Sequence, residues 1–341
     1  MSDPTLCMVG APGSPYSRKL RALLRYRRIP HTWVVRGSPE ARGLPRPRVE
    51  LLPQLIVPGA DGALEARTDT TPLVRTLELR HRGRSVIPGD PVVAFLDALI
   101  EDYADEWVTK CMFHYRWSYP ADVDKAARIL PRWFATDAPE ETAIAMGDRF
   151  AERQIERLFV VGSNETTAPV IEASYRRLLA TLDARLAVSR FVMGARPGTA
   201  DFALYGQLTQ LVGFDPTPAA LALAEAPRVV AWVAVVEELS GVEPTETDWL
   251  SRAAAGASLR ELLEEIGRVY APFLVANERA LTRGAERVAC TIDGRRWTQR
   301  PFPYQGKCLV WLREGRAALG VEDRDALDGI LADTGCEVLF A

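Results

Sequence analysis

The sequence predicts an α/β domain at its start, an all-α region after it, and a C-terminal extension that combines helices with a hairpin. Two observations predict this class. Short apolar runs alternate with a helical pattern over about the first 80 residues, whereas apolar residues from position 92 onward recur mainly at helical spacing. A length of 341 residues corresponds to about two domains of ~150 residues each, and 48% hydrophobic residues are ample for a sizeable core.

The chain opens with a strand, a turn and a helix. Residues 5–10 form a short apolar run that is typical of a buried strand, and a basic amphipathic pattern follows Pro15. Proline suits the first position of a helix because its missing N–H would have no partner there. Ser14 is therefore the expected N-cap, and capping alone would account for this serine.

Two later stretches continue the α/β pattern. Residues 51–57 read as a strand that carries Pro53 at its start. A proline there either begins the strand with an ordinary trans bond or is cis, where the chain makes a tight approach. An Asp-Gly pair at 61–62 then predicts a turn, and Asp69 with Thr70 precedes a helical pattern.

The middle of the chain reads as nearly all helix. Residues 92–118 form a long amphipathic pattern in which Tyr103 and Trp107 share one broad face. Packing between helices is one explanation of this face, and a ligand pocket is the other. Residues 139–161 and 168–188 indicate two further helices.

The extension begins at about residue 250. Residues 259–281 predict a helix, and an Asp-Gly pair at 293–294 predicts a tight hairpin. Residues 307–319 and 324–332 predict two closing helices. An extension of this composition is expected to pack on the body of the protein. It either covers a pocket or changes how subunits associate.

Composition excludes several function classes. A net charge of −3 without basic-aromatic motifs argues against nucleic acid, and no apolar run reaches the ~18 residues of a membrane span. The start of the chain lacks the pattern of a signal peptide. Five scattered cysteines indicate reduced thiols in the cytoplasm. We expect no metal, because His31, His81 and His114 lack zinc-site spacing to any cysteine.

In this order and spacing, the elements resemble the cytosolic glutathione S-transferase family, in its serine-type, bacterial-like form. Ser14-Pro15-Tyr16-Ser17 stands where redox members of the thioredoxin-like superfold carry Cys-x-x-Cys. Residues 194–202 are similar to the motif that opens a helix in the family's second domain. Gly198 departs from this motif, which usually has Ser or Thr there, while Asp201 keeps the expected acidic position.

The resemblance covers roughly residues 5–240 and implies an architecture. It implies a thioredoxin-like βαβαββα domain in residues 1–86 and a helical domain in residues 92–250. Residues 251–341 would then be the extension, packed on the helical domain. It also implies a homodimer, in which the thioredoxin-like domain of one subunit contacts the helical domain of the other.

The resemblance further implies glutathione as cosubstrate and a role for each site residue. The Ser14 hydroxyl, at the positive end of a helix, would stabilise the glutathione thiolate, with Ser17 and Tyr16 as fallback donors. Leu52, before a cis Pro53, would bind the cysteinyl part of glutathione through its backbone groups.

The remaining parts of glutathione would meet polar residues. Asp69 would bind the amine of the γ-glutamyl group, and Thr70 with the helix N-terminus its carboxylate. Asp69 as a simple helix cap is an alternative compatible with this role. Arg42, Arg46 or Arg48 would bind the glycine carboxylate.

Tyr103 and Trp107 would line the pocket for a hydrophobic small molecule, the electrophile that the thiolate attacks. Two other functions remain open from the sequence. One is a catalytically silent binding or assembly protein on the same fold, because fold does not fix function. The other is a specialised glutathione-dependent lyase, isomerase or dehalogenase.

Overall fold

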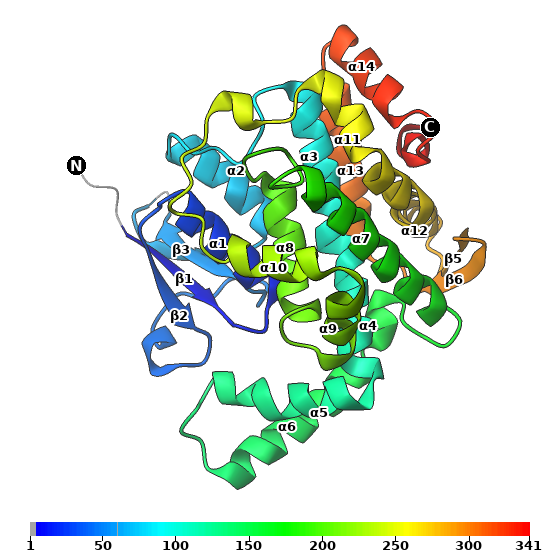
Figure 1. The fold of residues 1–341 in the computed structure, drawn as a ribbon. Coiled ribbons are helices and arrows are strands. Elements are labelled where there is room, and N and C mark those ends of the chain that lie inside the picture. The colour runs from blue at the N-terminus through cyan, green and yellow to red at the C-terminus, as the bar shows by residue number, and fades with distance from the viewer. Residues whose placement is uncertain (1–4, 60) are drawn as a thin grey trace.

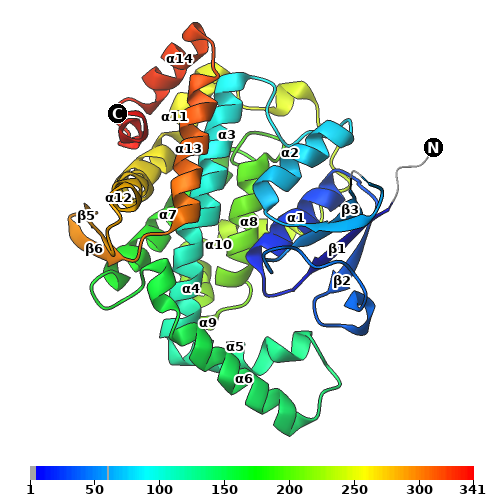
Figure 2. The ribbon, with the colours of Figure 1, turned by 180° about the vertical axis from the view of Figure 1, so that it is seen from behind.

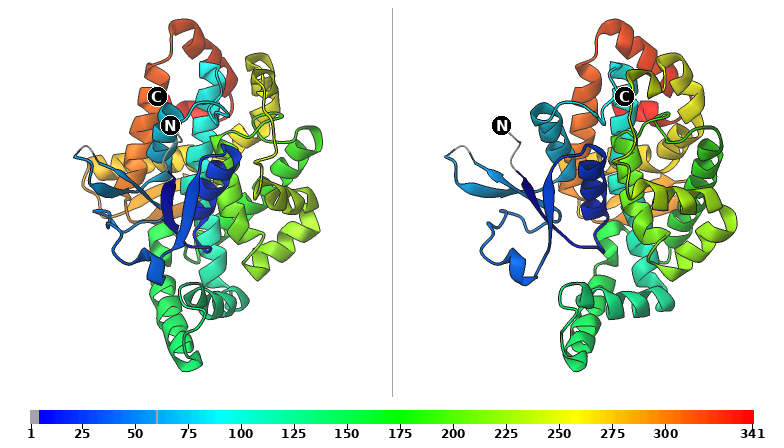
Figure 3. Two further views of the ribbon diagram at one scale, coloured as in Figure 1. Left: turned by 90° about the vertical axis from the view of Figure 1, so that its left-hand side faces the viewer. Right: turned by 60° about the vertical axis from the view of Figure 1, so that its left-hand side comes forward.

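The computed structural model describes residues 5–59 and 61–341, and it shows a small sheet domain beside a larger helical body (Figure 1). The elements of the first domain alternate as the sequence predicts. They are β1 (Leu6–Gly10), α1 (Pro15–Tyr26), β2 (His31–Val35), β3 (Gln54–Pro58), β4 (Leu64–Arg67) and α2 (Thr70–Arg80). Figure 3 shows α1 lying between the sheet and the helical body, where it packs on α8.

The four strands form one mixed sheet in the order β2-β1-β3-β4. Strand β1 runs parallel to β2 and antiparallel to β3, with Val9 opposite Gln54. Strand β4 runs antiparallel to β3, with Arg67 opposite Leu55. The carboxyl ends of β1, β2 and β4 therefore meet the start of β3 at one edge of the sheet. The thioredoxin-like arrangement that the sequence predicts is confirmed, and it brings the loops with the candidate residues to this edge.

One expected helix is absent from the described residues of this domain. Between β2 and β3, where βαβαββα requires a helix, the chain has only a three-residue 3₁₀ helix, Pro39–Ala41. Pro45 and Pro47 lack the N–H that a helix would use, and Gly43 adopts a positive φ of 79°. The segment therefore joins β2 to β3 as a loop of turns and bends.

The helical body continues from a linker at residues 81–90. Its elements are α3 (Pro91–Tyr103), a π-helical turn (Ala104–Val108), α4 (Thr109–Ser118), α5 (Pro120–Ile129), α6 (Glu140–Ile155), α7 (Ala168–Val188), α8 (Thr199–Leu211), α9 (Pro216–Glu225) and α10 (Pro227–Val236). The predicted helix over 92–118 is thus one long helix interrupted by the π-helical turn. Over the described residues, no single helix is long and apolar enough to cross a membrane; α9 and α10 reach that limit only as a pair bent by 115°.

The extension is ordered and packs on α3 and α7. Its elements are α11 (Arg252–Glu265), a π-helical turn (Ile266–Tyr270), α12 (Ala271–Thr282), β5 (Val288–Ile292), β6 (Arg295–Gln299), α13 (Pro303–Ala317) and α14 (Val321–Leu331). The predicted hairpin is confirmed, with positive φ values at Asp293 and Gly294. Figure 2 shows α13 running alongside α3. The division at residues 86, 92 and 250 stays a prediction.

Helix α8 begins at the motif where the sequence departs from the family pattern. The carboxylate of Asp201 accepts hydrogen bonds from the N–H of Gly198 at 3.0 Å and of Val192 at 2.7 Å. Asp201 therefore fixes the loop before α8, which is the structural role that its position predicts.

Candidate functional site

Ser14 begins α1 at the carboxyl end of β1. Its Oγ accepts a hydrogen bond from the N–H of Ser17 at 3.2 Å, so the predicted N-cap is confirmed. The side chain is half-buried. A hydroxyl has one donor as well as two acceptor lone pairs, so Ser14 can cap the helix and still donate to a ligand.

The two fallback donors have other partners. Ser17 is fully buried, and its Oγ accepts a hydrogen bond from the N–H of Ala11 at 3.3 Å. Tyr16 donates its hydroxyl to the backbone carbonyl of Asp105 at 2.8 Å. Burial, together with Glu106 and Asp105, raises the pKa of Tyr16 well above its ordinary value. Both residues thus hold the start of α1 in place: Ser17 binds the loop before the helix, and Tyr16 binds the helical body.

The peptide bond between Leu52 and Pro53 is cis, which is the isomer that the resemblance implies. Gln54, the first residue of β3, pairs with Val9, so Leu52 lies just beyond the paired part of the sheet. Within residues 5–59 and 61–341, no hydrogen bond uses the backbone N–H or C=O of Leu52. These two groups are available to an extended ligand at the edge of the sheet.

Asp69 and Thr70 lie at the start of α2, on the same edge. Asp69 has a φ of 77°, which is rare for a residue other than glycine, and its side chain makes no capping hydrogen bond. The simple capping alternative is therefore not realised. The first N–H groups of α2 lack a side-chain cap, and such a helix N-terminus favours an anion. The Asp69 carboxylate, which can bind a cation, thus lies beside the helix N-terminus, which can bind an anion.

The carboxylate of Asp69 has a partner that the sequence did not suggest. The hydroxyl of Tyr304, in α13 of the extension, donates to Asp69 Oδ2 at 2.9 Å. The two residues are 235 positions apart, and periodicity within α13 carries no sign of this contact. The extension therefore reaches the edge of the sheet.

A cleft of about 360 Å³ lies beside the loop that replaces the expected helix. Arg42 and Arg46 line it together with Arg36, whereas Arg48 does not. Val9 and Gln54 form part of its wall, so the cleft opens at the same edge as the other candidate residues. Guanidinium groups in this place can bind a carboxylate.

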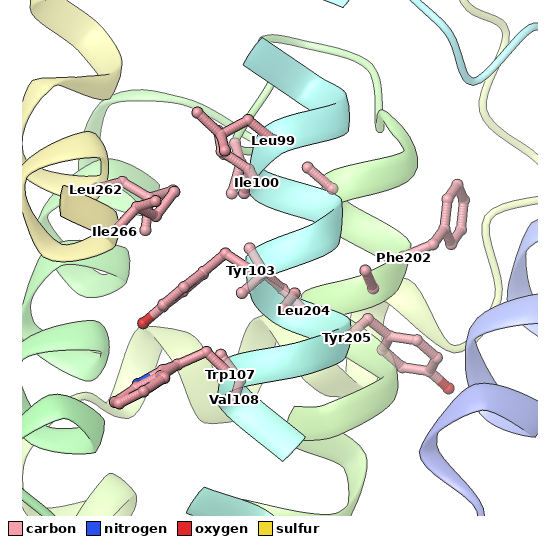
Figure 4. Packing of buried hydrophobic residues seen from close by; sticks show 14 of the residues in the cluster. Leu99, Ile100, Tyr103, Trp107, Val108, Phe202, Leu204, Tyr205, Leu262 and Ile266 are labelled. Atoms are coloured by element: carbon pink, nitrogen blue, oxygen red, sulfur yellow. The ribbon is translucent and has the colours of Figure 1, made fainter. Parts of the chain in front are cut away.

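Tyr103 and Trp107 are completely buried, and the structure places them in the core of the body. Figure 4 shows both side chains pointing from one face of the α3 segment toward the extension. The Trp107 ring centroid lies 5.2 Å from that of Trp297 in β6, and the Tyr103 ring centroid lies 6.1 Å from that of Tyr270. The extension fills the space where we expected a ligand pocket, so of the two explanations the structure favours packing.

A cluster of buried charges joins the two domains beneath the candidate site. Lys19 of α1 is fully buried, and its Nζ lies 2.6 Å from Glu101 Oε1 and 2.5 Å from Asp105 Oδ2. Burial raises the pKa of Asp105 to about 7 and that of neighbouring Glu106 to about 8. Burial makes the charged forms of these carboxyl groups costly, and the ammonium of Lys19 partly offsets this cost at Asp105.

The helical body also covers the loop before Ser14. A side chain at Gly13 would overlap Trp133 and Leu130, which follow α5. The backbone carbonyl of Gly13 accepts from Arg116 Nη1 at 3.4 Å, and Arg116 forms a buried ion pair with Asp215 at 2.8 Å. Sequence reasoning missed these contacts. The only available signal was the excess of helix before residue 194. In the part of the chain that the structure describes, no cluster of His, Cys, Asp or Glu can hold a metal ion.

Two family models match the chain. The model "Glutathione S-transferase, N-terminal domain" matches residues 8–85, and "Glutathione S-transferase, C-terminal domain" matches residues 141–234. Together they span just over half of the chain. A search of curated proteins found no match.

Several solved structures also resemble the chain. A glutathione transferase family member from Pseudomonas fluorescens, with two glutathione bound, is 16% identical over 68% of this chain and 87% of its own, with a TM-score of 0.43. A glutathione S-transferase from Methylobacterium radiotolerans, in complex with glutathione sulfonate, is 18% identical over 73% and 100%, with a TM-score of 0.42. The N-terminal family model matches the thioredoxin-like domain of the structure, and the C-terminal model matches part of the helical body that follows it. The chain therefore belongs to the glutathione S-transferase family.

Proposed function

We propose that the protein binds glutathione along the edge of the sheet and conjugates its thiolate to a hydrophobic electrophile. The observation that carries this proposal is the start of α2. There the helix N-terminus has no side-chain cap, and the Oδ1 atom of Asp69 accepts no hydrogen bond within the described residues. An amino acid group with one ammonium and one carboxylate matches this pair of charges. The γ-glutamyl end of glutathione is such a group.

Glutathione then lies along this edge from α2 toward β1. The ammonium of its γ-glutamyl group binds Asp69, and the carboxylate of the same group binds Thr70 and the α2 N-terminus. The unpaired backbone groups of Leu52 bind the cysteinyl part next to the cis Pro53. The glycine carboxylate reaches the arginine-lined cleft, where Arg42 or Arg46 binds it.

Ser14 is the residue that we propose for the chemistry. A free thiol has a pKa near ~8.5, so little thiolate is present at neutral pH. The Ser14 hydroxyl and the N-terminus of α1 stabilise the thiolate, and the thiol proton leaves to solvent. The thiolate then forms a carbon–sulfur bond as the leaving group of the electrophile departs.

The electrophile needs an apolar wall near Ser14. The extension fills the space beside Tyr103 and Trp107, so we propose that Leu130 and Trp133, which cover Gly13, provide this wall. The same filling favours a second candidate, a glutathione-binding protein without turnover. A lyase, isomerase or dehalogenase with its own pocket is a third.

We also propose a homodimer in the cytoplasm. All five cysteines are free and none is paired, which suits a reducing compartment. Size-exclusion chromatography with light scattering tests the dimer, and a monomer would contradict it.

Calorimetry with glutathione is the first experiment. We expect the wild-type chain to bind and Asp69→Ala to bind at least tenfold more weakly, a loss of ~1.4 kcal/mol. Asp61→Ala, in the exposed turn between β3 and β4, is the matched control and should bind like wild type.

A conjugation assay with an aryl halide then tests the reaction. Ser14→Ala should lose turnover while it still binds glutathione. Binding without turnover in wild type would support the second or third candidate, and a screen of metabolites would separate them. No binding at millimolar glutathione would refute the proposal.

A further inference from the structure

The extension reaches the proposed glutathione site through one hydrogen bond. Tyr304, in the first turn of α13, donates its hydroxyl to Asp69 Oδ2 at 2.9 Å. Burial and the nearby Asp69 raise the pKa of Tyr304, so the phenol stays protonated and remains a donor. The Asp69 carboxylate is thus held by a residue from the far end of the chain.

Three contacts fix the place of Tyr304. The amide of Asn277 in α12 exchanges two hydrogen bonds with the backbone of Phe302, at 2.8 and 3.0 Å, and so sets the start of α13. Gln305 donates to Glu106 Oε2 at 3.0 Å in the interior. One side of α13 also contacts α2, where Arg75 lies over the ring of Trp311. The position of Tyr304 is therefore set by contacts of α13 with α12, with Glu106 and with α2.

The contact leaves half of the carboxylate unused. A carboxylate accepts at both oxygens, and in the described chain Asp69 Oδ1 makes no hydrogen bond. An aspartate at the first position before a helix normally turns its side chain onto the free N–H groups. Asp69 makes no such capping bond, and its Oδ2 accepts from Tyr304 instead.

We propose that Tyr304 is a positioning residue of the ligand site, which keeps Asp69 off its own helix and presents Oδ1 to the ammonium of a γ-glutamyl ligand. This inference rests on the proposed function. It assigns a role to the extension: the first turn of α13 completes the amine-binding part of the site. Two effects then follow from Tyr304, a free α2 N-terminus for the ligand carboxylate and an oriented acceptor for its amine.

The test compares two ligands by calorimetry on the full chain. One is glutathione, and the other is glutaryl-cysteinyl-glycine, which lacks only the α-amino group. We expect Tyr304→Phe to weaken glutathione binding three- to tenfold and to weaken binding of the deamino ligand less, because that ligand keeps the carboxylate but has no amine to donate to Asp69. Tyr119→Phe is the matched control, because Tyr119 also donates to a carboxylate, that of Glu172, at 2.7 Å.

Each outcome bears on the proposal. An equal loss for both ligands would show a purely structural role and overturn it, as would tighter glutathione binding, which would mean that Tyr304 blocks the site. If wild type binds glutathione and Tyr304→Phe binds it with the same affinity, this inference is overturned but the proposed function is not. Absent binding by wild type would overturn the proposed function and this inference with it.

A second variant makes the result independent of folding effects in Tyr304→Phe. Asp69→Asn should lose the preference for glutathione over the deamino ligand, and adding Tyr304→Phe should then change that preference no further. Additive effects of the two substitutions on the preference would contradict the proposal. Thermal melts of each variant without ligand accompany the titrations.

Discussion

Asp97 of α3 occupies the space that a side chain at Gly198 would need. A Cβ at position 198 would overlap Asp97 Oδ1. The same carboxylate accepts hydrogen bonds from the N–H groups of Thr199 at 3.1 Å and Ala200 at 3.0 Å. The N-terminus of α8 is therefore capped by a neighbouring helix, and glycine replaces the usual Ser or Thr because the capping oxygen comes from elsewhere.

Gly198→Ser, the change toward the family pattern, should destabilise the protein. The new side chain collides with Asp97, and overpacking typically costs about 1–3 kcal/mol. Asp97→Ala should also destabilise, by about 0.5–2 kcal/mol for the lost cap. In the double variant the clash with Asp97 is gone and only the flexible side chain of Met193 must shift for Ser at 198 to cap α8, so the two costs should not add. Urea denaturation measures all three, and strictly additive costs would contradict this account.

Lys19→Met should destabilise the protein by about 3–5 kcal/mol, because it leaves Glu101 and Asp105 buried without a cation. Combining it with Glu101→Gln and Asp105→Asn removes those charges and should recover much of the loss. Denaturant midpoints of the single and triple variants test this. A single variant as stable as wild type would mean that the acids are already neutral.

Lys110 should make stability depend on alkaline pH. Its Nζ lies 4.4 Å from the ring centroid of Phe273, and burial lowers its pKa to about 7, against the effect of Glu106. In the unfolded chain the pKa is near ~10.4, so between pH 7 and 10 the unfolded state binds more protons. The lysine therefore contributes stability that rises with pH across this window.

The matched variant for this effect is Lys110→Met. As pH rises from 7 to 10, the melting temperature of wild type should increase relative to that of Lys110→Met. A constant difference between the two proteins would show that Lys110 titrates normally.

Ser14→Cys should carry a thiol with a pKa below the free value of ~8.5, because it lies at the N-terminus of α1. Ser17→Cys is the matched control: that position is fully buried, and burial should raise the thiol pKa instead. Thiolate absorbance, taken as the difference from wild type, gives both titrations. A normal pKa at position 14 would argue against thiolate stabilisation there.

Local rules predicted the parts of the site that local chemistry determines. Ser14 before Pro15 is a helix start on its own terms, and the Asp-Gly pair at 293–294 needs only its neighbours to form a hairpin. The order of strands then brings Ser14, Pro53 and Asp69 to one edge, which is a property of the whole fold.

Periodicity could not separate a pocket from a core. Tyr103 and Trp107 share a helix face in either case, and what covers that face comes from residues after 250. The same limit applies to Tyr304, whose contact with Asp69 depends on how α13 packs on α3. The helix expected between β2 and β3 does not form for a local reason. The prolines and glycines of that segment oppose a helix, and they are visible in the sequence.

The contact between Asp69 and Tyr304 also has a consequence during synthesis of the chain. The two residues are 235 positions apart, so a ribosome that adds ~5–20 residues per second makes Tyr304 about 10 to 50 s after Asp69. The thioredoxin-like domain is therefore synthesised well before Tyr304, the residue that we propose completes its amine site. A product that terminates early, anywhere before α13, would keep Ser14 and Pro53 but would lack Tyr304 and its hydrogen bond to Asp69.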